Sequence, residues 1–472
     1  MMQRKSVILG VIIILVSGFL TPGFSMASSS HIILYVDDDN LQGPWDGTLE
    51  HPYQHIQDAI DNASDHDTIR VHAGKYLNGE AIVITKPLQV VGNGSDLTHI
   101  ECPVRIVSDD VVLSGFTIRG FNSKQQKLTY CIQANAVHNC TIRGNNFSEG
   151  LNALEIECAD QILFENNSIS IESVKPIVYL FSCDHVIIRG ITITAITYGV
   201  YLDQCHSVFV ERNTFSSPSE EQSNLLHLNN CQNSTIERNT FLYCGDSISL
   251  YSSNHNRIQG NIFKNTSGGA ILLDRSQYNI ISQNEIHEAL YGVIHLNSGS
   301  DNNIIENNNL SGNSGASIGV YDSNNVIIRK NIIAENNPEG FGIIVYGNGN
   351  IIECNKIIKN GYGGIYIEES SNTLIMRNLI QQNGNSSLSW SGGIEVVMSR
   401  KNIIKWNNIE NNENFGLMVT ACLVNARFNW WGSPQGPNTV RHHSEGQNIV
   451  SQGSFVQTFP WLLFPYNIEW AR

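Results

Sequence analysis

A short pattern of apolar and polar positions recurs along most of this chain. Two apolar residues, two variable residues, an asparagine, a variable residue and an apolar residue follow one another, as in Ile280 to Ile286 around Asn284. Most copies lie 22 to 24 residues apart. We call the central position of each copy the anchor. The anchors are Phe116, Asn145, Asn167, Ile191, Asn213, Asn239, Asn261, Asn284, Asn308, Asn331, Asn355, Asn378, Asn407 and Asn429.

A second pattern lies between the anchors, where a glycine is followed by alternating apolar residues, as in Tyr198 to Leu202 and Gly364 to Ile367. A period of two predicts short strands, and Gly, Asn and Ser at the corners predict turns. Two or three such strands in each repeat describe one coil of a parallel β-helix. A leucine-rich repeat has a similar period, but stretches such as Lys359 to Gly363 are too short and glycine-rich for its helix, and Ile dominates over Leu.

We therefore predict an all-β protein, a right-handed parallel β-helix of about fourteen coils with a short N-terminal capping helix. In such a stack the anchor asparagines are expected at an inward turn, where each amide bonds to the coils above and below. This structural ladder is expected at Asn213, Asn239, Asn261, Asn284, Asn308, Asn331, Asn355, Asn378 and Asn407.

Both ends of the array carry features that would cover an exposed strand edge. Residues 53–63 place their apolar side chains on one face of a short amphipathic helix. Near the C-terminus, Gly432 and Pro434 mark a stop that precedes the apolar run 459–464. We expect a signal peptide at residues 1–27, opening strands and the capping helix at 28–110, coils at 111–432, and a capping tail at 433–472.

The N-terminus and the charge bear on location and partners. Arg4 and Lys5 precede an uncharged run over residues 6–20, which is typical of an export signal and too short for a membrane span, so no transmembrane helix is expected in the mature chain. The net charge of −15 becomes about −17 without those two residues and would repel phosphate backbones, which excludes nucleic acid as a partner. A secreted protein of the extracellular space or cell envelope is predicted, of unknown oligomeric state.

Four segments carry a resemblance to a known family: residues 47–53, 56–60 and 67–71 near the N-terminus, and Asn429-Trp430-Trp431-Gly432-Ser433-Pro434 near the other end. They resemble the opening and closing motifs of the NosD-like, or carbohydrate-binding and sugar-hydrolase (CASH), proteins, with PbH1 repeats and a pectin-lyase-like fold. Members of that family range from surface and adhesive proteins to uronan lyases, epimerases and an accessory protein of copper-enzyme maturation. No Asp-Pro-His-Glu sequence matches the epimerase motif.

The residues that alternate outward from the glycine-led strands combine aromatic rings with acids and amides, as sugar-binding surfaces do. The simpler explanation is that tyrosine suits strands. Carbohydrate-binding candidates are Tyr179, Tyr201, His227, Asn229, Tyr251, Asp274, Tyr321, Tyr346 and Tyr366, with Glu155, Phe181 and Asn297 in the same outward set. Insertions at Arg119 to Tyr130, Ser216 to Ser223 and Gly384 to Ser391, the last with Trp390, are expected to rim this face.

Four outward acids are candidates for catalysis. Coils stack about 4.8 Å apart, so Glu157 and Asp203, two coils apart, would be about 10 Å from one another. Glu368 and Glu395, diagonal neighbours on adjacent coils, would be roughly 8 Å apart. In inverting glycosidases the two catalytic carboxyl groups lie ~6.5–9.5 Å apart, so the first pair is at the outer limit of that range and the second is within it. A lyase would also need a cation for the substrate carboxylate, and the outward positions hold no Lys or Arg.

The chain also carries candidate metal ligands and a column of cysteines. Asp37, Asp38 and Asp39 offer hard oxygens for Ca²⁺. Cys183-Asp184-His185 and Cys205-His206 fall at matching turns, but their spacing is no recognised finger or cluster, so no copper or zinc is expected there. Cys183, Cys205 and Cys231 all precede their anchors by eight residues, which places them in one column where either disulfides or free thiols fit, with free thiols favoured.

The sequence thus favours a β-helix that binds polysaccharide or glycan along an outward face of tyrosines and acids. Three alternatives stay open. One is a polysaccharide-cleaving enzyme, either a glycoside hydrolase or a lyase. Another is a purely structural surface protein. The third, implied by the resemblance, is a periplasmic accessory of copper maturation.

Overall fold

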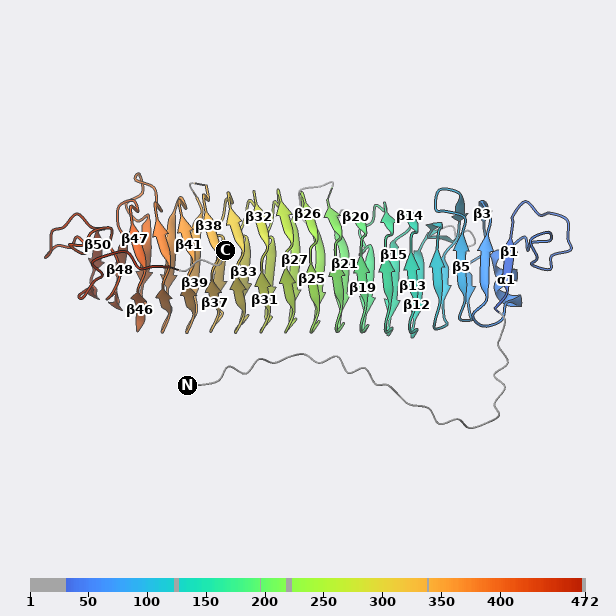
Figure 1. Cartoon of the computed structure of the whole chain (residues 1–472), viewed down its shortest axis with the longest axis horizontal. Coiled ribbons are helices and arrows are strands. Elements are labelled where there is room, and N and C mark those ends of the chain that lie inside the picture. Colours follow the sequence, from blue (N-terminus) through green and yellow to red (C-terminus); the bar gives the residue numbers. More distant parts are fainter. Residues whose placement is uncertain (1–30, 123–126, 196, 218–222, 338, 469–472) are drawn as a thin grey trace, which may run out of the picture.

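The computed structural model describes residues 31–122, 127–195, 197–217, 223–337 and 339–468. The chain winds into a long stack of coils, with the N-terminal coils at the right of Figure 1 and the C-terminal coils at the left. Each coil adds one short strand to each of three sheets, as β31 (Ile280–Ser282), β32 (Glu285–His287) and β33 (Ile294–Asn297) do. We call the sheets that contain these strands sheet 1, sheet 2 and sheet 3.

The three sheets have 18, 15 and 16 strands, which corresponds to about 15 coils. The strands that stack from coil to coil pair in parallel, as β31 does with β34 (Ile304–Glu306). The predicted all-β parallel β-helix is therefore confirmed, and the fourteen anchors understate the coils by about one. In the described residues the one helix is α1 (Ile56–Asn62), so the leucine-rich repeat is excluded.

The core is a set of apolar columns that run along the axis of the stack. Ile281 and Ile286, the middle residues of β31 and β32, point inward and are fully buried, as are Ile294 and Leu296 of β33. In sheet 2 the rings of Phe215, Phe241 and Phe263 lie one above the other, with centroids 4.9 Å apart at each step. Because full burial of one such side chain contributes roughly 1.5–3 kcal/mol, the repeated apolar position explains why the sequence forms this stack.

The corner between sheets 1 and 2 carries the anchor ladder. The residue before each anchor takes a left-handed backbone conformation, for example Gln283 with φ 58°, which turns the chain. The backbone N–H of Asn261 donates to Oδ1 of Asn284 at 3.0 Å, and Nδ2 of Asn284 donates to the carbonyl of Ile258 at 3.0 Å and to Oδ1 of Asn308 at 3.0 Å. The same pattern joins Asn213, Asn239, Asn261, Asn284, Asn308, Asn331, Asn355, Asn378, Asn407 and Asn429.

The other two corners also hold polar ladders, which the sequence analysis missed. Between sheets 2 and 3, the N–H of Asn383 donates to Oδ1 of Asn412 at 3.0 Å. Between sheets 3 and 1, the N–H of Asn279 donates to Oδ1 of Asn303 at 2.7 Å, and a column of serines adds bonds such as Ser276 N–H to Ser300 Oγ at 3.1 Å. Every corner of the coil therefore satisfies buried backbone donors with side chains of the next coil.

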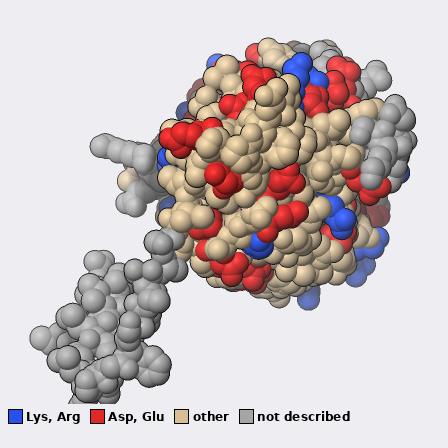
Figure 2. Space-filling view, turned by 90° about the vertical axis from the view of Figure 1, so that its right-hand side faces the viewer, with Lys and Arg blue, Asp and Glu red and all other residues tan. Residues whose placement is uncertain are grey.

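Both ends of the stack are covered. Helix α1 lies over the first coil and buries Ile56, Ala59 and Ile60, as the amphipathic pattern predicts. Figure 2, which looks at this end, shows acidic side chains scattered over it with few basic ones, and Asp58 and Asp61 are among its exposed acids. At the other end, Trp431 is fully buried.

The coils extend beyond the expected boundaries. Strands β2 (Thr68–Val71), β3 (Gly74–Tyr76) and β4 (Ile82–Ile84) already form a complete coil, well before residue 111. In the tail, β50 (Ile449–Gln452) and β51 (Phe455–Gln457) pair with the last coil and so continue the sheets. The expected signal peptide lies outside the described residues. Within the described part of the chain, no helix has the length and apolar character needed to cross a membrane.

Candidate functional site

The outward side chains of sheet 3 form two adjacent columns, where the sequence suggested one. Residues that directly pair across coils share a column, as Tyr179 does with Tyr201 and Phe181 with Asp203. The first column holds Arg105, Gln133, Glu155, Tyr179, Tyr201, His227, Ser249, Leu272, His295, Gly319, Ile344, Tyr366 and Glu395. The second holds Glu157, Phe181, Asp203, Asn229, Tyr251, Asp274, Asn297, Tyr321, Tyr346 and Glu368. The inward neighbours Val200, Leu202, Ile365 and Ile367 are buried.

Aromatic rings gather on this face near the C-terminal end. The ring of Phe341 lies 5.6 Å from that of Tyr366, 5.7 Å from Tyr362 and 6.4 Å from Trp390. Trp390 also lies 5.1 Å from Tyr362, and its side chain is 41% exposed. We call Phe341, Tyr362, Tyr366 and Trp390 the ring platform. Trp390 comes from the insertion at residues 384–391, which therefore does rim the outward face of sheet 3.

Two members of the ring platform were missed in the sequence. Phe341 opens strand β39 (Phe341–Tyr346), and Tyr362 directly precedes β42 (Gly363–Glu368). Neither fell at an alternating outward position of the repeat. The signal that could have found them is a bulky ring immediately beside a Gly-led strand, at Phe341-Gly342 and Tyr362-Gly363.

Two carboxyl groups lie beside the platform. Glu395 pairs directly with Tyr366, and Glu368 is the diagonal neighbour, as expected. The hydroxyl of Tyr366 donates to Oε2 of Glu368 at 2.7 Å. Burial, together with the nearby charge of Glu368, raises the pKa of Glu395 to about 7, and burial and the contact with Glu368 raise the pKa of Tyr346 to about 12. Glu395 is therefore about half protonated near neutral pH and can act as either acid or base.

A second aromatic group lies on the N-terminal half of sheet 3. The ring of Tyr201 lies 5.8 Å from Tyr179 and 4.7 Å from His227. Next to it, a cavity of about 350 Å³ is lined by Leu151, Asn152, Glu155, Lys175, Pro176 and Tyr179. Lys175 comes from the loop before β18 (Val178–Phe181) and adds a cation at the rim, and Arg105 is a second, exposed cation in the first column two coils before Glu155.

Glu157 and Asp203 lie in one column two coils apart, as expected, with Phe181 between them. Asp203 accepts a hydrogen bond from Nδ2 of Asn229 at 3.0 Å. In the middle of the sheet, the guanidinium of Arg275 lies over the ring of Tyr251, 5.2 Å from its centroid, and donates to its hydroxyl at 2.6 Å. The middle coils therefore offer less free ring surface than the two ends.

His295, also missed in the sequence, is half-buried in the same middle region. Burial lowers the pKa of His295 to about 4, and its ring lies 5.4 Å from that of Tyr321. A methyl group placed on Gly292 or Gly319 would collide with or crowd the His295 ring, so these glycines make room for it. His295 is therefore a neutral, packed histidine that begins a row of rings leading through Tyr321 and Tyr346 to Tyr366.

The metal candidates named from the sequence are placed differently from one another. Asp37 faces His72, with Oδ2 3.0 Å from Nδ1, and Asp38 accepts the N–H of Lys75 at 2.9 Å, so the carboxylates of Asp37 and Asp38 have separate partners. Calcium binding there stays a prediction. The thiols of Cys183 and Cys205 face the core, whereas His185 is exposed, so no mixed thiolate and imidazole site forms.

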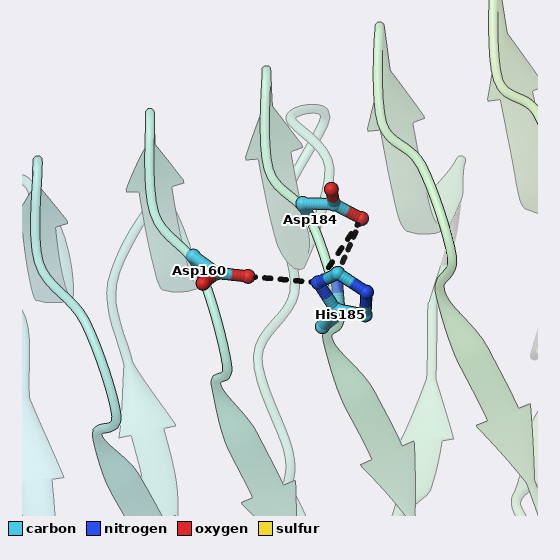
Figure 3. Close-up of side chains that lie close together, drawn as sticks. All are labelled: Asp160, Asp184 and His185. Carbon is cyan, nitrogen blue, oxygen red and sulfur yellow. Dashed lines mark hydrogen bonds and ion pairs between the residues drawn. The ribbon is translucent and has the colours of Figure 1, made fainter.

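A different group does bring metal-ligating atoms together. In the described part of the chain, Asp160, Asp184 and His185 place one ligand atom each within 4.8 Å of the others. Figure 3 shows Asp160 and Asp184 on adjacent turns, with the His185 ring directed toward both.

Comparison with known proteins agrees with this architecture. A family model described as a periplasmic copper-binding protein (NosD) matches residues 170–314, and a model for the right-handed β-helix region matches residues 107–220 and 336–429. The chain is a right-handed parallel β-helix protein, and its residues 170–314 match the NosD family. Curated protein sequences give no match to it.

Several solved structures resemble this β-helix chain at low sequence identity. The surface adhesin PfbA of Streptococcus pneumoniae is 14% identical, with 67% of this chain and 84% of that chain covered and a TM-score of 0.40. The periplasmic alginate epimerase AlgG is 13% identical, with 83% and 85% covered and a TM-score of 0.34. An alginate lyase, AlyF, is 12% identical, with 86% and 84% covered and a TM-score of 0.40.

Proposed function

We propose that this protein binds polysaccharide or glycan chains in the cell envelope or on the cell surface, along the outward face of sheet 3. The observation that carries the proposal is the ring platform beside Glu368 and Glu395. Sugar rings pack their apolar faces on aromatic side chains, while carboxyl and amide groups bond to their hydroxyls. Because the columns run along the stack with a repeat of about 4.8 Å, the face suits a linear polymer.

The ring platform can be tested by removing its rings. We expect Tyr366→Ala combined with Trp390→Ala to abolish glycan-array signal and retardation in polysaccharide-containing gels. The melting temperature should hardly move, since substitutions at accessible positions usually change stability by about half a kcal/mol. The pair Tyr346→Ala and Tyr366→Ala should act in the same direction.

A matched control uses tyrosines that are exposed elsewhere. Tyr243 and Tyr278 are each 52% exposed and lie at the two corners that flank sheet 3, outside both of its outward columns. Their double alanine variant should bind glycan as the parent does. Equal binding by the platform variant, or no binding by the parent to any glycan, would favour a structural surface protein instead.

A second candidate function, glycan cleavage, is favoured by the raised pKa of Glu395. A carboxyl group that is half protonated near neutral pH, next to a second carboxylate, is the arrangement that acid and base catalysis at a glycosidic bond requires. Incubation with a polysaccharide panel should then release reducing ends or unsaturated uronates. Glu395→Gln should abolish that release, whereas Glu353→Gln, on sheet 1, should not; release of no product by the parent would leave binding as the function.

A further inference from the structure

The corner between sheets 3 and 1 carries a column of turn residues that changes character along the stack. His138, Asp160, Asp184 and His206 pair directly from coil to coil, and Gln232 and Asn254 continue the column. The four N-terminal positions are thus imidazoles and carboxylates, and the following two are amides. The turns around the first four contain no lysine or arginine at residues 136–140, 158–162, 182–186 and 204–208.

The usual task of a side-chain oxygen in this column is to accept a backbone N–H of the next turn. Oδ1 of Asn254 accepts the N–H of Gln277 at 2.6 Å, and Oδ1 of Asn348 accepts that of Ser371 at 2.8 Å. Asp160 is arranged differently, because both of its carboxylate oxygens face imidazole nitrogens. Its Oδ1 lies 3.0 Å from Nδ1 of His185, and its Oδ2 lies 3.1 Å from Nδ1 of His138.

Asp184 completes the group from the neighbouring coil. Its Oδ1 lies 3.5 Å from Nδ1 of His185, the same nitrogen that faces Asp160. One imidazole nitrogen therefore points between two carboxylates of adjacent coils (Figure 3). The backbone holds this geometry, since His185 sits in a left-handed turn with φ 48° and its N–H donates to Oδ1 of Asp184 at 2.9 Å.

These distances match a first coordination sphere. Zinc binds imidazole nitrogen and carboxylate oxygen at about 2.0–2.2 Å, so the ligand atoms of a tetrahedral site lie roughly 3.3–3.5 Å apart. The separations of 3.0 and 3.5 Å from the imidazole nitrogen are close to this, and the two carboxylates, within 4.8 Å of one another, would have to rotate toward each other around the ion. All three side chains are between 40% and 59% exposed, which leaves room for the ion to enter and for water as a fourth ligand.

We propose that Asp160, Asp184 and His185 form a binding site for a divalent transition-metal ion of the zinc type. The ion replaces the proton that otherwise lies between Nδ1 of His185 and Oδ1 of Asp160. His138 is a positioning residue, because its bond to Oδ2 of Asp160 leaves Oδ1 directed at the metal, as outer partners of ligating carboxylates do. The site lies outside the ring platform and does not depend on glycan binding.

The chain itself supplies a matched control for the key ligand. His255 occupies the position equivalent to His185, one residue after the column residue Asn254, and it is also exposed in a left-handed turn with φ 58°. Its ring stacks on Tyr278 at 5.1 Å and faces no carboxylate pair. Loss of His255 therefore removes an exposed imidazole without touching the proposed site.

The test is titration of the untagged, chelator-treated full chain with ZnCl₂ by calorimetry. We expect one Zn²⁺ per chain, with affinity weakened at least about tenfold by His185→Ala and by Asp160→Asn, weakened less by His138→Ala, and unchanged by His255→Ala. Co²⁺ bound in place of zinc should give visible absorption bands of a four-coordinate ion, which His185→Ala should abolish.

Three results would overturn the site. They are no heat of binding by the parent, Zn²⁺ affinity that survives both His185→Ala and Asp160→Asn, and Ca²⁺ binding as tight as Zn²⁺ binding that does not need the imidazole. Because the residues are surface-exposed, an unchanged melting temperature of each variant shows that the comparison concerns metal binding alone.

Discussion

Glu395 is a residue whose charge state depends on folding. Its pKa rises from 4.5 to about 7 because it is half-buried beside the rings, with Glu368 as a nearby negative charge. Below about pH 4.5 the group is protonated in both the folded and unfolded chain and has no effect on stability. Between the two pKa values the folded chain binds more protons, so the free energy of unfolding falls as the pH rises, and the penalty is complete above about pH 7.

The substitution Glu395→Gln removes that titration. We expect the variant and the parent to unfold with equal free energy at pH 4. At pH 8 the variant should be more stable by on the order of 1 kcal/mol, a value kept small because solvent screens a half-exposed group. Denaturant unfolding at both pH values measures this. Glu353→Gln on sheet 1 is the control, and a pH-independent difference for Glu395→Gln would contradict the assignment.

The cysteines differ in solvent exposure, so their reactivity toward an alkylating reagent should differ as well. Cys183, Cys205 and Cys231 are at most 1% exposed, whereas Cys158 is exposed, and all are free thiols. Because only an accessible thiolate reacts, native alkylation should label Cys158 and spare the other three. In denaturant without reductant, mass spectrometry should find all four alkylated. Protection of these cysteines in denaturant would instead show disulfides.

At the scale of one coil, the corner asparagines matter more than any single strand. Asn284 is fully buried and bonded to the coils on both sides. Asn284→Leu leaves its former donors and acceptors unpaired, at ~1–3 kcal/mol each, so the midpoint of chemical unfolding should fall clearly. Asn309→Leu, in the outward part of β35 (Asn309–Ser311), is the control and should leave the midpoint nearly unchanged. Equal midpoints for both variants would refute a stabilising ladder.

The coil was predictable from the sequence because a single kind of residue, Ile or Asn, repeats at a fixed place in it. The other two corner ladders were not seen, since Ser, Cys and Asn replace one another there, as Cys231, Ser253 and Ser276 do along one column. All three side chains fit the same buried turn, so the pattern is one of size and bonding rather than of residue identity.

Only two of the four residues of the ring platform were recognised in the sequence, for a different reason. Tyr366 and Glu395 follow the alternation of the strand, but Phe341 and Trp390 reach the platform from a strand start and a loop. Likewise, the contacts of Asp160 with His138 and His185 depend on which way three turns point their side chains. Alternation gives the face of a strand residue, but it carries no information about loop side chains.

At the scale of the molecule, a stack this long depends on its ends. Ile60 is fully buried where α1 covers the first coil. Ile60→Asp places an unpaired carboxylate in that contact, so the helix should detach and expose strand edges that pair with other molecules. Light scattering after size exclusion should show oligomers and a lower melting temperature. Asp61→Asn, on the exposed side of α1, should remain as the parent; the same particle size for both would refute a capping role.

The anchor ladder also has a direction along the chain, which bears on the order in which its hydrogen bonds can form. The N–H of Asn213 donates to Oδ1 of Asn239, and that of Asn239 to Oδ1 of Asn261. The acceptor of each anchor N–H therefore lies later in the chain. In a chain that is synthesised from the N-terminus, the anchor N–H of a coil can form this bond only after the next coil has been made. Until then the N–H of its newest anchor lacks this acceptor, while the bonds from that coil back to the preceding one, such as Nδ2 of Asn239 to the carbonyl of Val210, can already form. The ladder between sheets 2 and 3 has the same direction. Its last acceptor is the side-chain oxygen of Gln447 in the tail, which accepts the N–H of Asn412 at 2.9 Å.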